Sequence, residues 1–293
     1  MGEAAGHRFG QIIGEEIFEK AIYTLLKGFA EKHQLYLDKE GTRPARKGKS
    51  VKWKDRYGNV HDLDFVMEKG GTSLKTGQPV AFIEVAWRSY TKHSKNKAQE
   101  IEGAIVPLVD THSRVAPFAG VILAGRFTNN ALTQLRSRGF KVLYFPSDSV
   151  FKAIRVVGID GYFDEVTPDK VLAEKISAWS CLSEDRRSEV RDHLIASHSA
   201  EIEQFLASLE AAVNRQIACV RVFPLHGKAF DMASVDEAIK FVEAFHLVEE
   251  GAPVRYEIDI RFNNGDQIRG LFAERYEALE FLMSFQPPPL ESV

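Results

Sequence analysis

Three carboxylates interrupt segments of the sequence that are otherwise apolar. Asp62 and Asp64 lie in VHDLDFVM, and Glu84 is the single charged residue of PVAFIEVAW. Both segments are rich in β-branched and aromatic residues, so each is predicted to be a β-strand. Alternate side chains of a strand share a face, so Asp62 and Asp64 are expected to point to one side, and pairing of the two strands would bring Glu84 beside them.

Carboxylates in such surroundings favour a bound cation. An ionised carboxylate is costly to bury unless it is paired, hydrogen-bonded or coordinated to a metal. Mg²⁺ takes a small number of carboxylates, a main-chain carbonyl and several waters, and such a site can act on a phosphodiester. The alternative is that the acids form ion pairs with nearby Lys and Arg, and for isolated acids that structural interpretation is the better one.

The segment around these acids is strongly basic. Residues 39–97 contain 14 Lys and Arg against 6 Asp and Glu, a local charge of +8 in a chain whose net charge is −3. A basic segment with interspersed aromatic residues suits contact with a phosphate backbone, whereas the alternative is a solvated loop. The part that we expect to bind nucleic acid is TRPARKGKSVKWKDRYGN, which contains Arg43, Arg46, Lys47, Lys49, Lys52, Lys54 and Arg56 beside Trp53 and Tyr57.

Length and composition set the class of protein. The chain has 293 residues, of which 44% are hydrophobic and 27% charged, as in folded globular proteins of one large or two smaller domains. No run approaches the roughly 18 apolar residues of a membrane span, and the opening MGEAAGHRFG lacks an apolar signal core. Cys181 and Cys219 have neither metal-ligand spacing nor a disulfide pattern. We therefore expect a cytoplasmic protein without a membrane partner.

The pattern along the chain predicts a mixed α/β core. Residues 10–33 repeat apolar side chains at helical spacing, the two acid-bearing strands follow, and residues 95–108 return to a helical pattern. The segments FAGVILAG, NNALTQLRSRG and FKVLYFP are then predicted as strand, helix and strand. We expect the core to span residues 1–157, a helical connector to span 158–214, and a small α+β domain of order β-α-β-β-α to span 215–293.

This order of elements resembles the PD-(D/E)xK nuclease superfamily, which has the restriction-endonuclease-like fold, over roughly residues 10–157. The resemblance implies a mixed sheet flanked by helices, with metal ligands in HDLDFV and IEVAW. Asp64, with Asp62 as the alternative, and Glu84 would bind Mg²⁺, for which Mn²⁺ could substitute. The third carboxylate would come from the first helix, as Glu15, with Glu16 and Glu19 as alternatives.

The chain departs from this family at one position. The family lysine, which activates the attacking water and stabilises charge on the phosphate, would fall at position 86, where this chain has Ala86. A lysine at the start of the next helix is a known variation of the family pattern, and Lys92, Lys95 and Lys97 are available there. The resemblance favours Lys92 or Lys95 in that role. Arg88 and Lys97 are expected to contact DNA together with the basic segment.

Together these features predict a Mg²⁺-dependent endonuclease that hydrolyses phosphodiester bonds of double-stranded DNA, of the type II restriction class. Cutting both strands of a two-fold symmetric site favours a homodimer, with the C-terminal domain reading sequence or forming the dimer interface. Ala86 favours an alternative, a catalytically silent DNA-binding or partner-binding module of a defence or repair system. A small-molecule enzyme with a phosphate turn in FAGVILAGRFTNNAL is disfavoured, because that segment lacks the GxGxxG and GxxxxGKS/T patterns.

Overall fold

The chain folds into two compact units. The computed structural model describes residues 5–91, 94–224, 228–245 and 255–286. The N-terminal unit is Met1–Val213 and the C-terminal unit is Asn214–Val293. Residues 158–213, predicted to be a separate connector, belong instead to the N-terminal unit, because their helices pack on the same hydrophobic core as its sheet.

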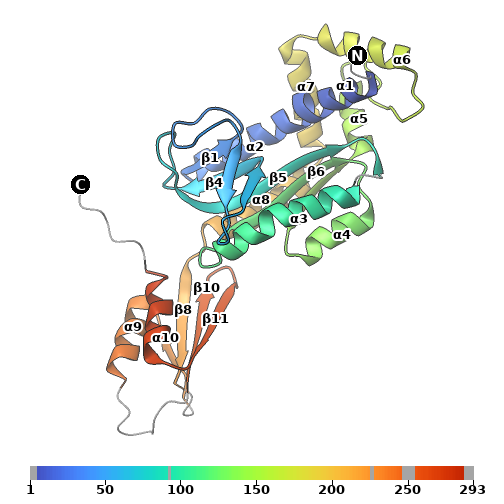
Figure 1. The fold of residues 1–293 in the computed structure, drawn as a ribbon. Coiled ribbons are helices and arrows are strands. Elements are labelled where there is room, and N and C mark those ends of the chain that lie inside the picture. Colours follow the sequence, from blue (N-terminus) through green and yellow to red (C-terminus); the bar gives the residue numbers. More distant parts are fainter. Residues whose placement is uncertain (1–4, 92–93, 225–227, 246–254, 287–293) are drawn as a thin grey trace. The chain divides into compact units, whose positions relative to one another are not determined.

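A five-stranded mixed sheet forms the centre of the N-terminal unit (Figure 1). In sheet order its strands are β1 (Leu35–Lys39), β4 (Phe65–Lys69), β5 (Gln78–Arg88), β6 (Phe118–Gly125) and β7 (Lys141–Pro146). The pairs β1·β4 and β4·β5 are antiparallel, whereas β5·β6 and β6·β7 are parallel. β6 is almost uninterrupted in its apolar residues because both of its faces are covered.

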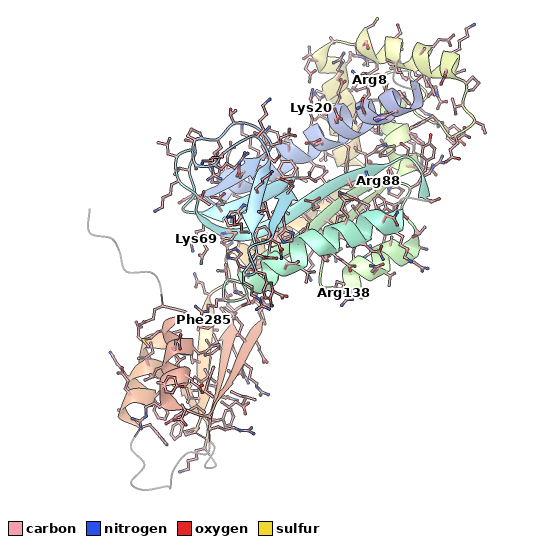
Figure 2. All side chains as sticks on the ribbon, viewed as in Figure 1. Arg8, Lys20, Lys69, Arg88, Arg138 and Phe285 are labelled. Atoms are coloured by element: carbon pink, nitrogen blue, oxygen red, sulfur yellow. The ribbon has the colours of Figure 1, made fainter. Side chains whose placement is uncertain are left out.

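Helices cover both faces of the sheet, and side chains fill the space between them (Figure 2). One face packs against α3 (Ser94–Thr111), α4 (Asn129–Ser137) and a hairpin of β2 (Val51–Lys54) and β3 (Val60–Leu63). A continuous helical run packs on the other face and begins earlier than predicted, as α1 (Ala5–Gln11), the π-helix η1 (Ile12–Glu19) and α2 (Lys20–Lys32). The same core includes α5 (Ser147–Arg155), α6 (Asp169–Ser180), α7 (Glu184–Ala196) and α8 (Ser199–Val213).

The segment predicted as one acid-bearing strand is two strands. β3 pairs with β2 in the hairpin, β4 pairs with β1 and β5 in the main sheet, and the chain bends at Asp64 between them. The prediction that Asp62 and Asp64 share a face is therefore wrong. Asp62 lies exposed on the hairpin, where its carboxylate is 3.9 Å from the ammonium of Lys52.

The C-terminal unit is an antiparallel sheet with two helices packed on its core. Its strands run in the order β11-β10-β8-β9. The predicted β-α-β-β-α order gains one short strand, β9, which pairs with β8. The elements in chain order are β8 (Ile217–Phe223), β9 (Phe230–Met232), α9 (Val235–Ala244), β10 (Tyr256–Phe262), β11 (Gln267–Phe272) and α10 (Arg275–Met283).

Two arginines of the basic segment lie in the interior of the N-terminal unit. The guanidinium of Arg43 donates to Asp38 at 2.8 Å and to both carboxylate oxygens of Glu68 at 2.6 and 2.9 Å. It also donates to the main-chain carbonyls of Thr72 and Lys75. Arg43 is only 5% exposed, so it holds the segment against β1 and β4 and does not contact nucleic acid as expected.

Arg46 is committed to the same cluster. Its guanidinium donates to the Asp38 carboxylate at 3.1 Å and to the main-chain carbonyl of Lys39 at 2.7 Å. The expected nucleic-acid contact of Arg46 is therefore also corrected, because its charge is already paired within the protein.

We expect the change Arg43→Ala to lower the free energy of unfolding of the N-terminal unit by about 3–5 kcal/mol, because Glu68 and Asp38 would remain buried without their cation. Urea unfolding followed by tryptophan fluorescence measures this unit alone, since Trp53, Trp87 and Trp179 all belong to it. The control is Lys47→Ala, at an exposed position of the same segment. Equal urea midpoints for the two variants would contradict the stabilising role of Arg43.

Candidate functional site

Asp64 and Glu84 lie side by side where the hairpin joins the sheet. The pairing of Phe65 with Ile83 sets the register that places the two acids next to each other. The main-chain N–H of Val85 donates to the Asp64 carboxylate at 2.8 Å, and the N–H of Asp64 donates to the Glu84 carboxylate at 3.2 Å. Each carboxylate is thus held by the backbone of the other's strand, so their mutual position is fixed by the sheet.

The environment of this pair disfavours two negative charges. The pKa of Glu84 is raised to about 8, chiefly because burial destabilises its charged form and then because Asp64 repels it, while Lys97 opposes the shift. Burial also raises the pKa of Asp64, and a hydrogen bond from Val85 acts in the opposite direction. Burial is the largest cause of both shifts, so the charged forms of these acids are disfavoured, and a proton or a cation would stabilise the pair.

The lysine beside these acids is Lys97. Its ammonium lies 3.7 Å from Glu84 and 2.8 Å from the exposed carboxylate of Glu100, and its side chain is 12% exposed. Lys97 comes from the first turn of α3, which packs on the face of β5 that carries Ala86. Because alanine leaves that face without a long side chain, a lysine from the helix can reach the acid from the same side.

Of the two lysines expected at the site from the sequence, the structure describes only Lys95, and it does not lie there. Lys95 lies exposed on α3, two residues before Lys97, so its ammonium points to solvent. Lys92 lies outside the described residues. The first turn of a helix puts neighbouring residues on different faces, and the side chain that faces β5 is Lys97 rather than Lys95.

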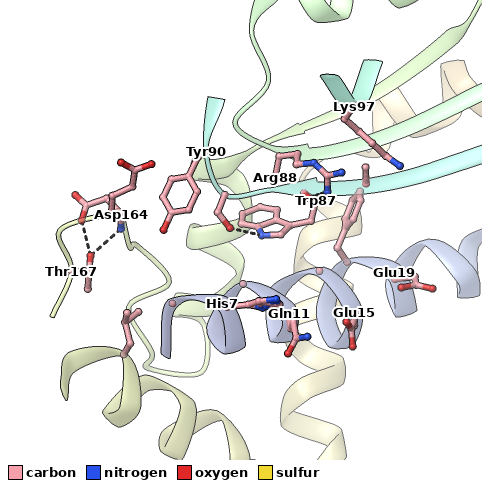
Figure 3. A pocket seen from close by; sticks show the side chains of 18 of the residues that line it. His7, Gln11, Glu15, Glu19, Trp87, Arg88, Tyr90, Lys97, Asp164 and Thr167 are labelled. Atoms are coloured by element: carbon pink, nitrogen blue, oxygen red, sulfur yellow. Dashed lines mark hydrogen bonds between the residues drawn. The ribbon is translucent and has the colours of Figure 1, made fainter. Parts of the chain in front are cut away.

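A polar stripe of the N-terminal helices lines a cleft of about 680 Å³ together with Asp64 and Lys97 (Figure 3). Close approach of helix and strand is possible because Gly14 packs on Trp87, where an added Cβ would lie 3.4 Å from the Cβ of the tryptophan. The stripe consists of four residues spaced four apart along α1 and η1, which are His7, Gln11, Glu15 and Glu19.

Glu15 and Glu19, but not Glu16, belong to this cleft. The pKa of Glu19 is raised by burial and then by the charge of Asp64, so the helix acid and the strand acid influence each other. The carboxylate of Glu16 turns away, where it accepts from the indole N–H of Trp179 at 3.0 Å and pairs with Arg187. The π-helical turn, which widens the spacing of the backbone, occurs at the segment that carries both cleft acids, as π-helical segments often do at functional sites.

The donor set fits a hard divalent cation. Within the described part of the chain, no group of three or more His, Cys, Asp and Glu is arranged as a metal site. Mg²⁺, however, needs only one or two carboxylates because it retains several waters. Asp64 and Glu84 supply two adjacent, nearly buried carboxylates whose pKa values are raised chiefly by burial. Glu15 lines the same cleft as Asp64.

The other basic residues predicted to bind nucleic acid lie at two places. Arg88 lines the cleft and donates to the main-chain carbonyl of Trp87 at 2.9 Å. The remaining five are exposed on the loop and hairpin that precede Asp64, and they are Lys47, Lys49, Lys52, Lys54 and Arg56.

Sequence reasoning missed two parts of the cleft. The first is the wall formed by Trp87, near the end of β5, and Tyr90, which follows that strand. The second is the polar stripe, although the four-residue spacing of His7, Gln11 and Glu15 is visible in the sequence and marks one helix face. That spacing could have indicated which helix acids share a side.

Comparisons with known proteins add little information about this site. No protein-family model matches the chain, and no curated protein matches it. A solved structure of a protein of unknown function, AF1548, is similar at 9% sequence identity and a TM-score of 0.25, covering 64% of this chain and 94% of that one. This similarity is too low to support an argument about fold or function. In the described residues, no helix has the length and apolar character needed to cross a membrane.

Proposed function

We propose that this chain is a Mg²⁺-dependent endonuclease that hydrolyses phosphodiester bonds of double-stranded DNA. The observation that carries the proposal is the convergence of Asp64, Glu84 and Lys97, of which Asp64 and Lys97 line the cleft. Two carboxylates and an ammonium in that arrangement are the groups that phosphodiester hydrolysis requires. The restriction-endonuclease-like fold is part of the proposal, supported by the order of the acidic helix, the Asp-bearing bend, the Glu-bearing strand and the lysine-bearing helix.

Each residue has a distinct role in this proposal. Asp64 and Glu84 would hold Mg²⁺, or Mn²⁺ in its place, and the bound cation supplies positive charge that activates water at neutral pH. The ammonium of Lys97 stabilises negative charge that develops on the phosphate, because it is already fixed beside Glu84. Arg88, on the wall of the cleft, orients a phosphate oxygen.

The exposed lysines give the proposed enzyme its DNA-binding surface. They lie on the loop and hairpin that lead directly into Asp64, so a duplex that contacts them is positioned at the cleft. Type II restriction specificity, a homodimer and a recognition or dimerisation role for the C-terminal unit extend the proposal by the two-fold symmetry of such sites.

A second candidate is a catalytically silent DNA-binding or partner-binding module. Ala86 favours it, because the family lysine is absent from its usual strand position. Lys97 weighs against it, since a nearly buried ammonium beside a nearly buried carboxylate pair is retained at the same place.

We expect Glu84→Gln to abolish cleavage while the protein stays folded, because the change removes a cation ligand and also removes a buried charge. Asp64→Asn is expected to behave alike, and Asp62→Asn, on the exposed hairpin, is the matched control with full activity. The assay follows plasmid and phage DNA with Mg²⁺, with Mn²⁺ and with EDTA. Wild-type activity in folded Glu84→Gln protein would remove this site from consideration.

Lys97→Ala is expected to lower the cleavage rate by about 10²- to 10³-fold, the usual effect of losing one charge-stabilising donor. DNA binding is expected to persist, because the exposed lysines remain. Lys95→Ala is the control, since this neighbour on α3 faces solvent. Single-turnover cleavage and a filter-binding assay measure the two quantities separately. A wild-type protein that binds DNA but cleaves none with either metal would make the silent module the better account.

Replacing Lys47, Lys49, Lys52 and Lys54 together by Ala is expected to weaken DNA binding and to reduce its salt dependence. The slope of log K against log salt falls by roughly 0.9 for each phosphate of duplex DNA that the protein no longer neutralises, because fewer counterions are released. Fluorescence anisotropy over a range of salt concentrations measures the slope. An unchanged slope would show that these lysines are only a solvated surface.

A further inference from the structure

The tip of the hairpin formed by β2 and β3 presents an exposed aromatic side chain. Tyr57 lies in the turn between the two strands and is 74% exposed. The guanidinium of Arg56 lies over its ring, 5.0 Å from the ring centroid. A tyrosine combines a large apolar ring with a polar end, which makes it a common anchor at binding surfaces. The hairpin tip therefore has a side chain that is available to a partner.

The turn holds Tyr57 on a rigid support. The buried carboxylate of Asp55 accepts from the main-chain N–H groups of Tyr57 and Asn59, both at 2.9 Å. It also accepts from the side-chain amide of Asn59 at 2.9 Å. The main-chain N–H of Arg56 donates to the hydroxyl of Thr111, at the end of α3, at 2.8 Å. These bonds fix the backbone that carries the ring relative to the rest of the N-terminal unit.

The two faces of the hairpin differ in what they contact. Neighbouring residues of a strand point to opposite sides. Trp53 points inward, where its ring packs edge-on against Phe82 of β5, with centroids 5.9 Å apart. Lys52 and Lys54, on either side of it, are exposed on the outward face. The exposed ring thus stands at the end of a basic surface that is itself supported by the sheet.

The surroundings of the ring indicate the chemistry of its partner. Lys54 and Arg56 are exposed close to Tyr57 in the sequence, whereas the acid among them, Asp55, is only 6% exposed and is bonded within the turn. A ligand that suits this tip is anionic and also offers flat apolar surface. Nucleic acid has both properties, because its phosphates pair with cations and its bases stack on aromatic rings. The same hairpin leads directly into Asp64.

We propose that Tyr57 is a wedge that enters a base step of the bound duplex and stacks on one of its bases; this inference rests on the DNA binding of the proposed function. Insertion of a side chain between neighbouring base pairs partly unstacks and kinks the duplex, which costs free energy. The rigid turn lowers that cost, because little conformational freedom remains to be lost on binding. The wedge gives the protein a preference for base steps that open easily, such as mismatched ones.

The test compares binding of the full-length protein, in EDTA, to a matched duplex and to the same duplex with one central mismatch, by fluorescence anisotropy. We expect the wild type to bind the mismatched duplex about tenfold more tightly, because the mismatch removes part of the unstacking cost. Tyr57→Ala is expected to abolish this preference, whereas Tyr57→Phe keeps it, since the ring stacks without its hydroxyl. The matched control is Tyr276→Ala, at a tyrosine of the C-terminal unit that is 66% exposed, and it is expected to keep the preference.

The wedge and the nuclease function fail separately, because binding in EDTA needs neither metal nor cleavage. A mismatch preference that is lost in Tyr57→Ala and kept in Tyr57→Phe supports the wedge. If such a protein cleaves no DNA with Mg²⁺ or Mn²⁺, the nuclease function fails and the wedge stands in a silent DNA-binding module. A protein that cleaves DNA but shows no mismatch preference, or keeps the preference in Tyr57→Ala, overturns the wedge alone. Equal weakening of both duplexes by Tyr57→Ala also overturns it, because the ring then contacts only the backbone.

Discussion

Burial of two adjacent carboxylates is the constraint around which the site of the N-terminal unit is arranged. Two main-chain hydrogen bonds fix Asp64 and Glu84 side by side, so the acids cannot turn outward to regain water. The surrounding structure supplies one ammonium, from Lys97, and further acids across the cleft. A fold that keeps such a pair accepts a cost in stability, which is typical of sites that are built for a ligand and not for packing.

Other buried acids of the same unit have their negative charge compensated by an arginine. Glu68 and Asp38 are as deeply buried as Glu84, yet they are fully satisfied by Arg43 through charge-assisted hydrogen bonds. The contrast identifies Asp64 and Glu84 as exceptional. One cluster attaches the basic segment to the sheet, and the other keeps two acids with raised pKa values beside a cleft that Asp64 lines.

The fold was largely readable from the sequence, because periodicity reports burial directly. The apolar repeats predicted the long first helix, β5 and the helix that starts near Lys95, and the structure contains all three. Periodicity could not show the bend at Asp64, because hairpin and sheet strands carry the same alternating pattern. It also could not place the helices of residues 158–213, since whether a helix packs on a distant sheet depends on tertiary contacts.

Site prediction failed where it depended on the direction of a single side chain. Asp64 and Glu84 were predicted from their apolar neighbours and lie side by side, whereas Lys97 was assigned to DNA contact because three lysines stand close together in the sequence and only helix phase distinguishes them. Arg43 and Arg46 were counted with the surface charges, because charge density along a sequence does not reveal which side chains turn inward. The resemblance to a nuclease superfamily remains a prediction.

The bend at Asp64 separates the segment that sets the position of the acid from the segment that forms the hairpin, which a continuous strand would couple. The register of the acid is set on the sheet side, by the pairing of Phe65 with Ile83, while the hairpin ends in a turn held by Asp55, which accepts from the N–H groups of Tyr57 and Asn59. The tip can therefore change in length or composition without shifting the acid. The hairpin tip is for that reason the natural place for grafting new contacts onto this unit.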